Sequence, residues 1–153
     1  MAPPTLEELI YSAAQRALDQ QSTALSDLRT RTSTLVAAAT LSASFLGAAA
    51  IGRSAPAWAV ALAMAAFLLT GAFAGWVLWR ARVSFAIDAD RVQEELSPYR
   101  EDPAAYLLRA ARGLHDTYLE NEIVIERREI VFGFALFALG AETLLWALAL
   151  VLA

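Results

Sequence analysis

Three apolar blocks, each about as long as the core of a bilayer, limit what this chain can fold into. They cover residues 34–52, 57–79 and 130–153. The first two contain no Asp, Glu, Arg or Lys, and the third contains one such residue, Glu142. A helix that crosses a membrane needs roughly 20 mostly apolar residues, and each block meets that length. The sequence therefore predicts an all-α membrane protein with three transmembrane helices.

Composition narrows the function classes. The 153 residues are 58% hydrophobic with a mean hydropathy of +0.47, well above a typical soluble domain. There is no cysteine, which excludes disulfides and thiol catalysis, and one histidine excludes a multi-histidine metal site within one subunit. A net charge of −4 argues against a dedicated nucleic-acid binder. Since catalytic triads, Walker elements and dinucleotide fingerprints are also missing, we expect no enzyme activity, cofactor or metal.

The chain divides into four predicted segments. Residues 1–33 form a cytoplasmic amphipathic helix that starts at a Thr-Leu-Glu-Glu capping box. Residues 34–79 form a transmembrane hairpin, 80–129 a cytoplasmic helical hairpin, and 130–153 the third transmembrane helix. The first helix either runs directly into the first span or bends around residues 20–26, where polar residues dilute the apolar stripe. We expect the last cytoplasmic helix to continue into the third span. The apolar stripes of the cytoplasmic helices serve either packing within the chain or assembly with other copies.

Arginine placement predicts the orientation. Arginines flank the same side of all three spans, and the opposite turn carries one. The residues on the rich side are Arg29, Arg31, Arg80, Arg82, Arg127 and Arg128, and the one in the turn is Arg53. Positive residues favour the cytoplasmic side. We therefore expect an inner-membrane protein with a cytoplasmic N-terminus, an outer C-terminus and the lipid bilayer as a partner.

Glu142 is the strongest candidate for a functional residue. An ionised carboxylate inside a bilayer costs at least about 2.5 kcal/mol, so Glu142 must be neutral, hydrogen-bonded or hydrated. Ser42 and Ser44 of the first span and Thr70 of the second are its expected partners at similar depth. Three interpretations stay open: a pore-lining or proton-sensing carboxylate, a neutral residue that holds helices in register, or a shallow residue that reaches the outer headgroups.

Small residues predict close helix packing. Gly71 and Gly75 form a GxxxG element in the second span, and Ala43 with Gly47 gives the first span a similar face. Such faces let helix backbones approach closely. The sequence leaves open whether they pack within the hairpin or between subunits.

Cytoplasmic charges offer a weaker candidate site. Arg91, Arg100, Arg109 and Arg112 could hold an anionic ligand such as a nucleotide phosphate. His115 and Glu122 lie two helical turns apart, and either belong to a solvated helix face or to a metal site shared between subunits. The solvated face is our default interpretation.

The entry to the first span resembles a known family. Residues 28–39 read LRTRTSTLVAAA and resemble the corresponding entry in small bacterial Pycsar transmembrane effectors and related SLATT-type domains. In that family the entry reads as Leu-Asp-Thr-Lys-Ala before small and aliphatic residues. Thr30 and Leu35 match, Arg31 takes the place of the lysine, and Arg29 stands where an acidic residue is usual. The resemblance implies a membrane-disrupting effector in antiphage defence that a nucleotide signal triggers.

Two functional hypotheses follow. The first is a homo-oligomeric membrane protein that forms or gates a conduction path, which the family resemblance extends to a defence effector. The alternative is an accessory or scaffold membrane protein whose cytoplasmic helices bind a partner without conduction.

Overall fold

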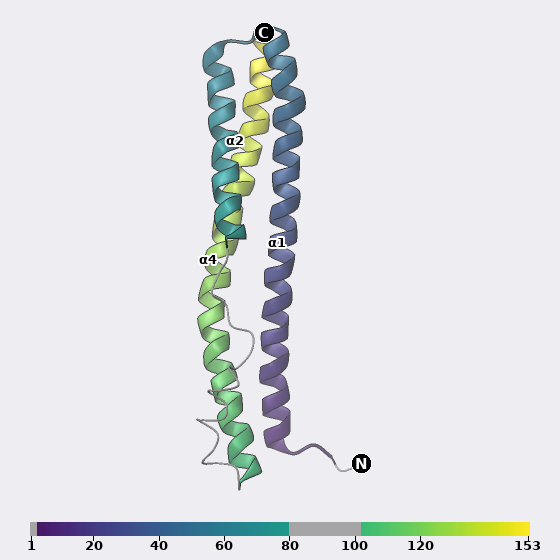
Figure 1. Ribbon diagram of the computed structural model, residues 1–153, viewed down its shortest axis with the longest axis vertical. Helices are drawn as coiled ribbons and strands as arrows, with labels where there is room; N and C mark the ends of the chain where they lie inside the picture. The colour runs from purple at the N-terminus through teal and green to yellow at the C-terminus, as the bar shows by residue number, and fades with distance from the viewer. Residues whose placement is uncertain (1–2, 80–101) are drawn as a thin grey trace. The chain divides into compact units, whose positions relative to one another are not determined.

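The computed structural model describes residues 3–79 and 102–153, and these fold into three helices with no strand among them. Helix α1 covers Leu6–Gly52, α2 covers Ala57–Leu78 and α4 covers Pro103–Val151 (Figure 1). All three are long and apolar enough to cross a membrane, which is compatible with a multi-pass membrane protein. The all-α fold with three candidate spans is therefore confirmed. Of the helical hairpin predicted over residues 80–129, residues 80–101 lie outside the described residues.

Both long helices begin at capping residues, and the first of these is the predicted capping box. At the start of α1, the Thr5 backbone N–H donates to Glu8 Oε2 at 2.9 Å, and the Glu8 N–H donates to Thr5 Oγ1 at 3.3 Å. Before α4, Asp102 Oδ1 accepts from the N–H groups of Ala104 and Ala105. These contacts satisfy backbone donors that a helix start leaves unpaired. Neither helix is interrupted before its apolar block.

The chain forms two compact units, which we describe separately. Unit 1 comprises Met1–Ser26 and Ala81–Glu126, and unit 2 comprises Asp27–Arg80 and Arg127–Ala153. In the described part of unit 1, the Gln21 side-chain amide donates to the Tyr118 carbonyl at 3.0 Å. Leu18, Leu25, Ala111 and Leu114 are among its buried side chains.

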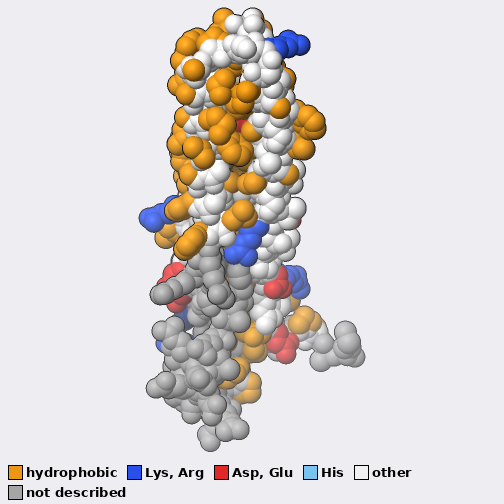
Figure 2. All heavy atoms as spheres, turned by 45° about the horizontal axis from the view of Figure 1, so that its top comes forward, with side chains coloured by type: hydrophobic (Ala, Val, Ile, Leu, Met, Phe, Trp, Pro, Cys, Tyr) orange, Lys and Arg blue, Asp and Glu red, His pale blue; other side chains and the backbone are white. Residues whose placement is uncertain are grey.

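Unit 2 holds the apolar parts of all three helices, and its C-terminal end lies beside the turn between α1 and α2 (Figure 1). Its core near this turn is formed by Trp146 among alanines: Ala50, Ala59, Ala63 and Ala149. Hydrophobic side chains also cover the upper part of the face in Figure 2, which belongs to this unit. Small core residues allow the helix axes to lie close together, which is how helices gain van der Waals contact inside a membrane.

The turn between α1 and α2 is a Schellman motif in which Ser54, and not a glycine, takes the left-handed position. The Ala55 N–H donates to the Ala50 carbonyl at 3.0 Å, and the Ser54 N–H donates to the Ile51 carbonyl at 3.1 Å. Ser54 therefore adopts φ 61°, the left-handed conformation that this motif requires at its first residue beyond the helix. Ala55 packs against the core that contains Ala50, which is the apolar contact that usually accompanies the motif.

Replacement of Ser54 by glycine should therefore stabilise unit 2. A residue with a Cβ pays about 1 kcal/mol or more in the left-handed region, and glycine does not. We expect Ser54→Gly to raise the unfolding free energy in detergent by about 1 kcal/mol. Arg53→Gly is the matched control, because Arg53 does not have a positive φ, and should lower stability slightly. A lower unfolding free energy for Ser54→Gly would contradict this account of the turn.

Candidate functional site

Glu142 lies completely inside unit 2. Its exposed fraction is 0%, and neither carboxyl oxygen has a hydrogen-bond partner among the described residues. It therefore does not reach a surface of the unit, which rules out the shallow position at the outer headgroups. Leaving a buried polar group without a partner costs about 1–3 kcal/mol, and more when the group is charged. Glu142 thus destabilises the arrangement that buries it.

The level of Glu142 on α1 follows from the core of unit 2. Gly47 packs against the Trp146 ring, which a Cβ at Gly47 would approach to 3.1 Å. Ala50 and Ala149 belong to the same core cluster as Trp146. In both pairs the α4 residue follows the α1 residue by 99 positions, and within unit 2 the two helices run in the same direction (Figure 1). The same register places Glu142 opposite Ala43 and next to Ser42.

The level of Glu142 on α2 follows from the rings of Phe73 and Phe134, whose centroids lie 6.0 Å apart. Because α2 runs antiparallel to α4, eight residues up α4 correspond to eight residues back along α2. Glu142 therefore lies level with the stretch between Ala63 and Ala66, both of which are buried. The helix opposite the carboxyl offers it methyl groups and no polar side chain.

The predicted hydroxyl partners of Glu142 form other bonds or none. Thr70 is buried but donates to the Ala66 carbonyl at 3.0 Å, and it lies about 7 Å along the helix axis from the level of Glu142. Ser44 is exposed and donates to the Thr40 carbonyl at 2.7 Å. The expected pairing with these two is therefore not formed. Ser42 is at the right level, and its buried Oγ has no partner.

Trp146 completes the polar cluster, and the sequence analysis missed it. Its indole lies one helical turn beyond Glu142 and interacts with the carboxyl. The contact falls short of a hydrogen bond, because Trp146 Nε1 and both carboxyl oxygens are unpartnered. The spacing of four residues between Glu142 and Trp146 was a signal that could have revealed the pair. Three polar groups, on Ser42, Glu142 and Trp146, are thus buried without partners in one apolar unit.

Arg128 lies at the end of unit 2 that is far from the turn between α1 and α2. It is buried, and its guanidinium donates to the Val77 carbonyl and, at 2.7 Å, to the Trp79 carbonyl. The carbonyls at the end of a helix lack partners within it and carry partial negative charge. Arg128 therefore caps α2, and it also lies 6.0 Å from the centre of the Trp76 ring. Burial, followed by the positive charge of Arg29, lowers the pKa of Arg128 from its ordinary value.

The predicted packing glycines divide into two groups. Gly47 is buried against Trp146, and Ala43 is half-buried on the same side of α1. Gly71 and Gly75 are exposed, and a Cβ at either would meet nothing within 4 Å. Among the described residues, the GxxxG element therefore does not pack within the hairpin.

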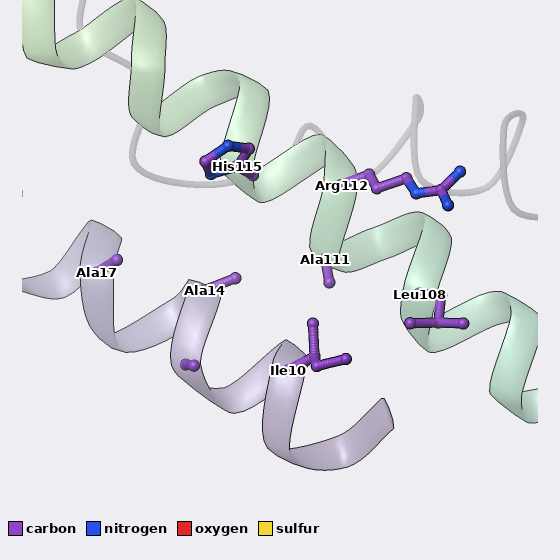
Figure 3. A pocket seen from close by; sticks show the side chains of 8 residues that line it. Ile10, Ala14, Ala17, Leu108, Ala111, Arg112 and His115 are labelled. Carbon is purple, nitrogen blue, oxygen red and sulfur yellow. The ribbon is translucent and has the colours of Figure 1, made fainter. Parts of the chain in front are cut away.

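A groove of about 430 Å³ lies in unit 1 between α1 and α4. Its walls are mostly small and aliphatic, and Ile10 and Ala111 point toward one another across it (Figure 3). Arg112 and His115 belong to its rim, with the Arg112 guanidinium directed away from α1. Of the other predicted anion-binding residues, Arg109 is exposed, and Arg91 and Arg100 lie outside the described residues. The described chain contains no cluster suited to a metal ion.

Comparison with known proteins identifies no relative: no family model, curated protein or solved structure matches the chain.

Loss of the Arg128 cap should weaken unit 2. Arg128→Met keeps the length of the side chain but removes both donors to the end of α2, and a lost hydrogen bond to a buried group costs about 1–3 kcal/mol. We expect that decrease in the unfolding free energy in detergent. Arg127→Met is the matched control, because Arg127 is exposed, and should change stability by less than about 0.5 kcal/mol. Equal effects of the two substitutions would exclude the proposed capping role.

Proposed function

We propose that this chain is a multi-pass protein of the inner membrane that assembles with copies of itself and forms or gates a conduction path. The observation that carries the proposal is the buried, unpartnered carboxyl of Glu142. A carboxyl that forms no hydrogen bond contributes nothing to holding helices in register. Its polarity is useful only in a second arrangement of the helices, in which water reaches it.

The burial of Glu142 supplies the free energy for such a change. The arrangement described here leaves the carboxyl without a partner, and any movement of α1 or α2 away from α4 that admits water removes that cost. When two conformations differ by a few kcal/mol, a ligand that binds one of them more tightly shifts the population toward it. Glu142 would then face the water-filled path in the open state and the alanines of α2 in the closed state.

Helix α4 offers a physical connection from the water-exposed side to the carboxyl. It continues for 49 residues without a break from Pro103 to Val151. A signal that binds near Arg109 or Arg112 therefore acts on the helix that also carries Glu142. The resemblance to Pycsar and SLATT-type effectors suggests a nucleotide as this signal and membrane disruption in antiphage defence as the outcome. Ser42, Ser44 and Thr70 are the further polar residues proposed for the path.

The proposed orientation places the N-terminus in the cytoplasm and the C-terminus outside. It rests on the arginines that flank the spans. The exposed tryptophans near both ends of α2, Trp58 and Trp76 at 56% and 50% exposed, are consistent with two membrane interfaces but do not set the direction. Tryptophan is enriched at both membrane interfaces. Protease accessibility of tags at the two termini in oriented membrane vesicles tests this topology.

Substitution of Glu142 tests the proposal. Glu142→Leu replaces an unpartnered polar group by an apolar one of similar size, so we expect it to raise the unfolding free energy by about 1–3 kcal/mol and to reduce potassium flux from reconstituted vesicles. Glu142→Gln should also reduce flux while the assembly survives. Thr143→Val is the matched control, because Thr143 is exposed and bonds only to its own helix, and should leave both quantities unchanged.

The opposite pattern would exclude a functional carboxyl. If Glu142→Gln keeps full flux and Glu142→Leu dissociates the assembly, the residue has only a structural role. If the wild-type protein passes no ions or dye, with and without a panel of cyclic nucleotides, the conduction path itself is wrong.

The alternative, a scaffold that binds a partner without conduction, is favoured by one observation in unit 1. Leu6 and Leu9 at the start of α1 are 67% and 50% exposed, and the groove lined by Ile10 lies beside them. Large apolar side chains exposed on the water side are typical of interaction surfaces. A stable monomer in detergent and sealed vesicles would support this function over the first.

A further inference from the structure

The GxxxG element of α2 presents an open apolar surface. Gly71 and Gly75 lie on the exposed side of the helix, with free space where their side chains would be. In lipid, helices associate through van der Waals packing, and small residues allow that contact. A surface with two exposed glycines one turn apart therefore accepts a large side chain from another helix.

Helix α4 carries large side chains on its own outer face. They recur at every seventh position, so they form one stripe along the helix. The stripe consists of Ile130, Phe137, Leu144 and Val151, which are 55%, 78%, 73% and 82% exposed. Phe137, near the middle of the third apolar block, protrudes most among the aromatic side chains of this block.

The two surfaces lie at the same depth. The contact between Phe73 and Phe134 fixes the level of α2 against α4. Three residues up α4 from Phe134 correspond to three residues back from Phe73, which places Phe137 level with Thr70, one residue from Gly71. In the same way Ile130 lies level with Val77, two residues from Gly75. Copies inserted in one membrane with one orientation share these depths, so Phe137 of one copy meets Gly71 of a neighbour.

We propose that the α4 stripe of each copy packs on the Gly71–Gly75 surface of α2 in the next copy, with Phe137 seated over Gly71. This inference rests on the proposed function, because it names the subunit interface that the proposed oligomer uses. The two surfaces differ, so the interface is heterologous and each copy offers both halves. Such contacts build rings when the rotation closes, and a ring is the arrangement that surrounds a conduction path.

The absence of native cysteine makes this interface directly testable. A disulfide forms when two Cβ atoms lie about 4 Å apart, which the proposed contact allows between positions 71 and 137. We expect Gly71→Cys and Phe137→Cys, co-expressed as separate single variants, to give a covalent dimer in oxidised membranes. Neither variant alone should dimerise. One chain that carries both substitutions should give a ladder of higher oligomers.

Two matched controls separate face from depth. Leu136→Cys replaces a residue that is 55% exposed at nearly the same depth but on another face of α4, and Leu144→Cys lies on the stripe about 10 Å further along the helix. Neither should cross-link to Gly71→Cys. Gly71→Leu, whose Cβ would meet nothing within 4 Å among the described residues, should keep the unfolding midpoint of the monomer and lose the oligomer in mild detergent.

Three results would overturn the interface. Self-dimerisation of Phe137→Cys alone would indicate a two-fold contact between α4 helices. No cross-linking in any combination would indicate that lipid covers both faces. Equal cross-linking of the controls would indicate random collision. Potassium flux measured on the same preparation separates this inference from the proposed function. Cross-linked rings without flux would support the interface and refute conduction. Flux without cross-linking would support conduction and refute the interface.

Discussion

Inside a bilayer no water is present to pair with backbone or side-chain polar groups, and unit 2 satisfies nearly all of its polar groups internally. Its helices close their own backbone bonds, and Thr32, Ser44 and Thr70 donate to carbonyls four residues earlier. The Schellman turn after α1 and the Arg128 cap on α2 supply the partners that helix ends lack. Against this background, the unpartnered polar groups of Ser42, Glu142 and Trp146 are exceptions that the fold tolerates at a cost.

That cost links stability to function. A leucine at position 142 would fit an interior of alanines better than a carboxyl does, and the small residues around it leave little besides Trp146 for it to contact. Groups that weaken one conformation bias a protein toward another. The described arrangement of unit 2 is therefore held by packing, by the contact of Gly47 with Trp146 and by the Arg128 cap, and it is opposed by the unpartnered polar groups of Ser42, Glu142 and Trp146.

Much of the fold could be predicted from the sequence, because long apolar blocks and capping residues act locally. The starts at Thr5 and Asp102 and the uninterrupted run of both long helices follow from patterns within a few residues. The partners of Glu142 could not be predicted, since they depend on the register between helices. In the register that the antiparallel pair adopts, Thr70 lies away from the carboxyl, and this register is visible only in contacts between the helices, such as that of Phe73 with Phe134 and the bonds of Arg128 to the end of α2.

The unbroken course of α4 has a consequence for how the protein can move. The backbone hydrogen bonds of an α-helix lie within the helix itself, so α4, which is helical from Pro103 to Val151, can turn about its own axis without losing any of them. Axial rotation by roughly one residue, about 100° at 3.6 residues per turn, would carry Glu142 out of the alanine interior and bring a neighbouring side chain in. Arg128 lies on the same helix, and its guanidinium donates to the Val77 and Trp79 carbonyls at the end of α2. Such a rotation would therefore have to break both of these hydrogen bonds first.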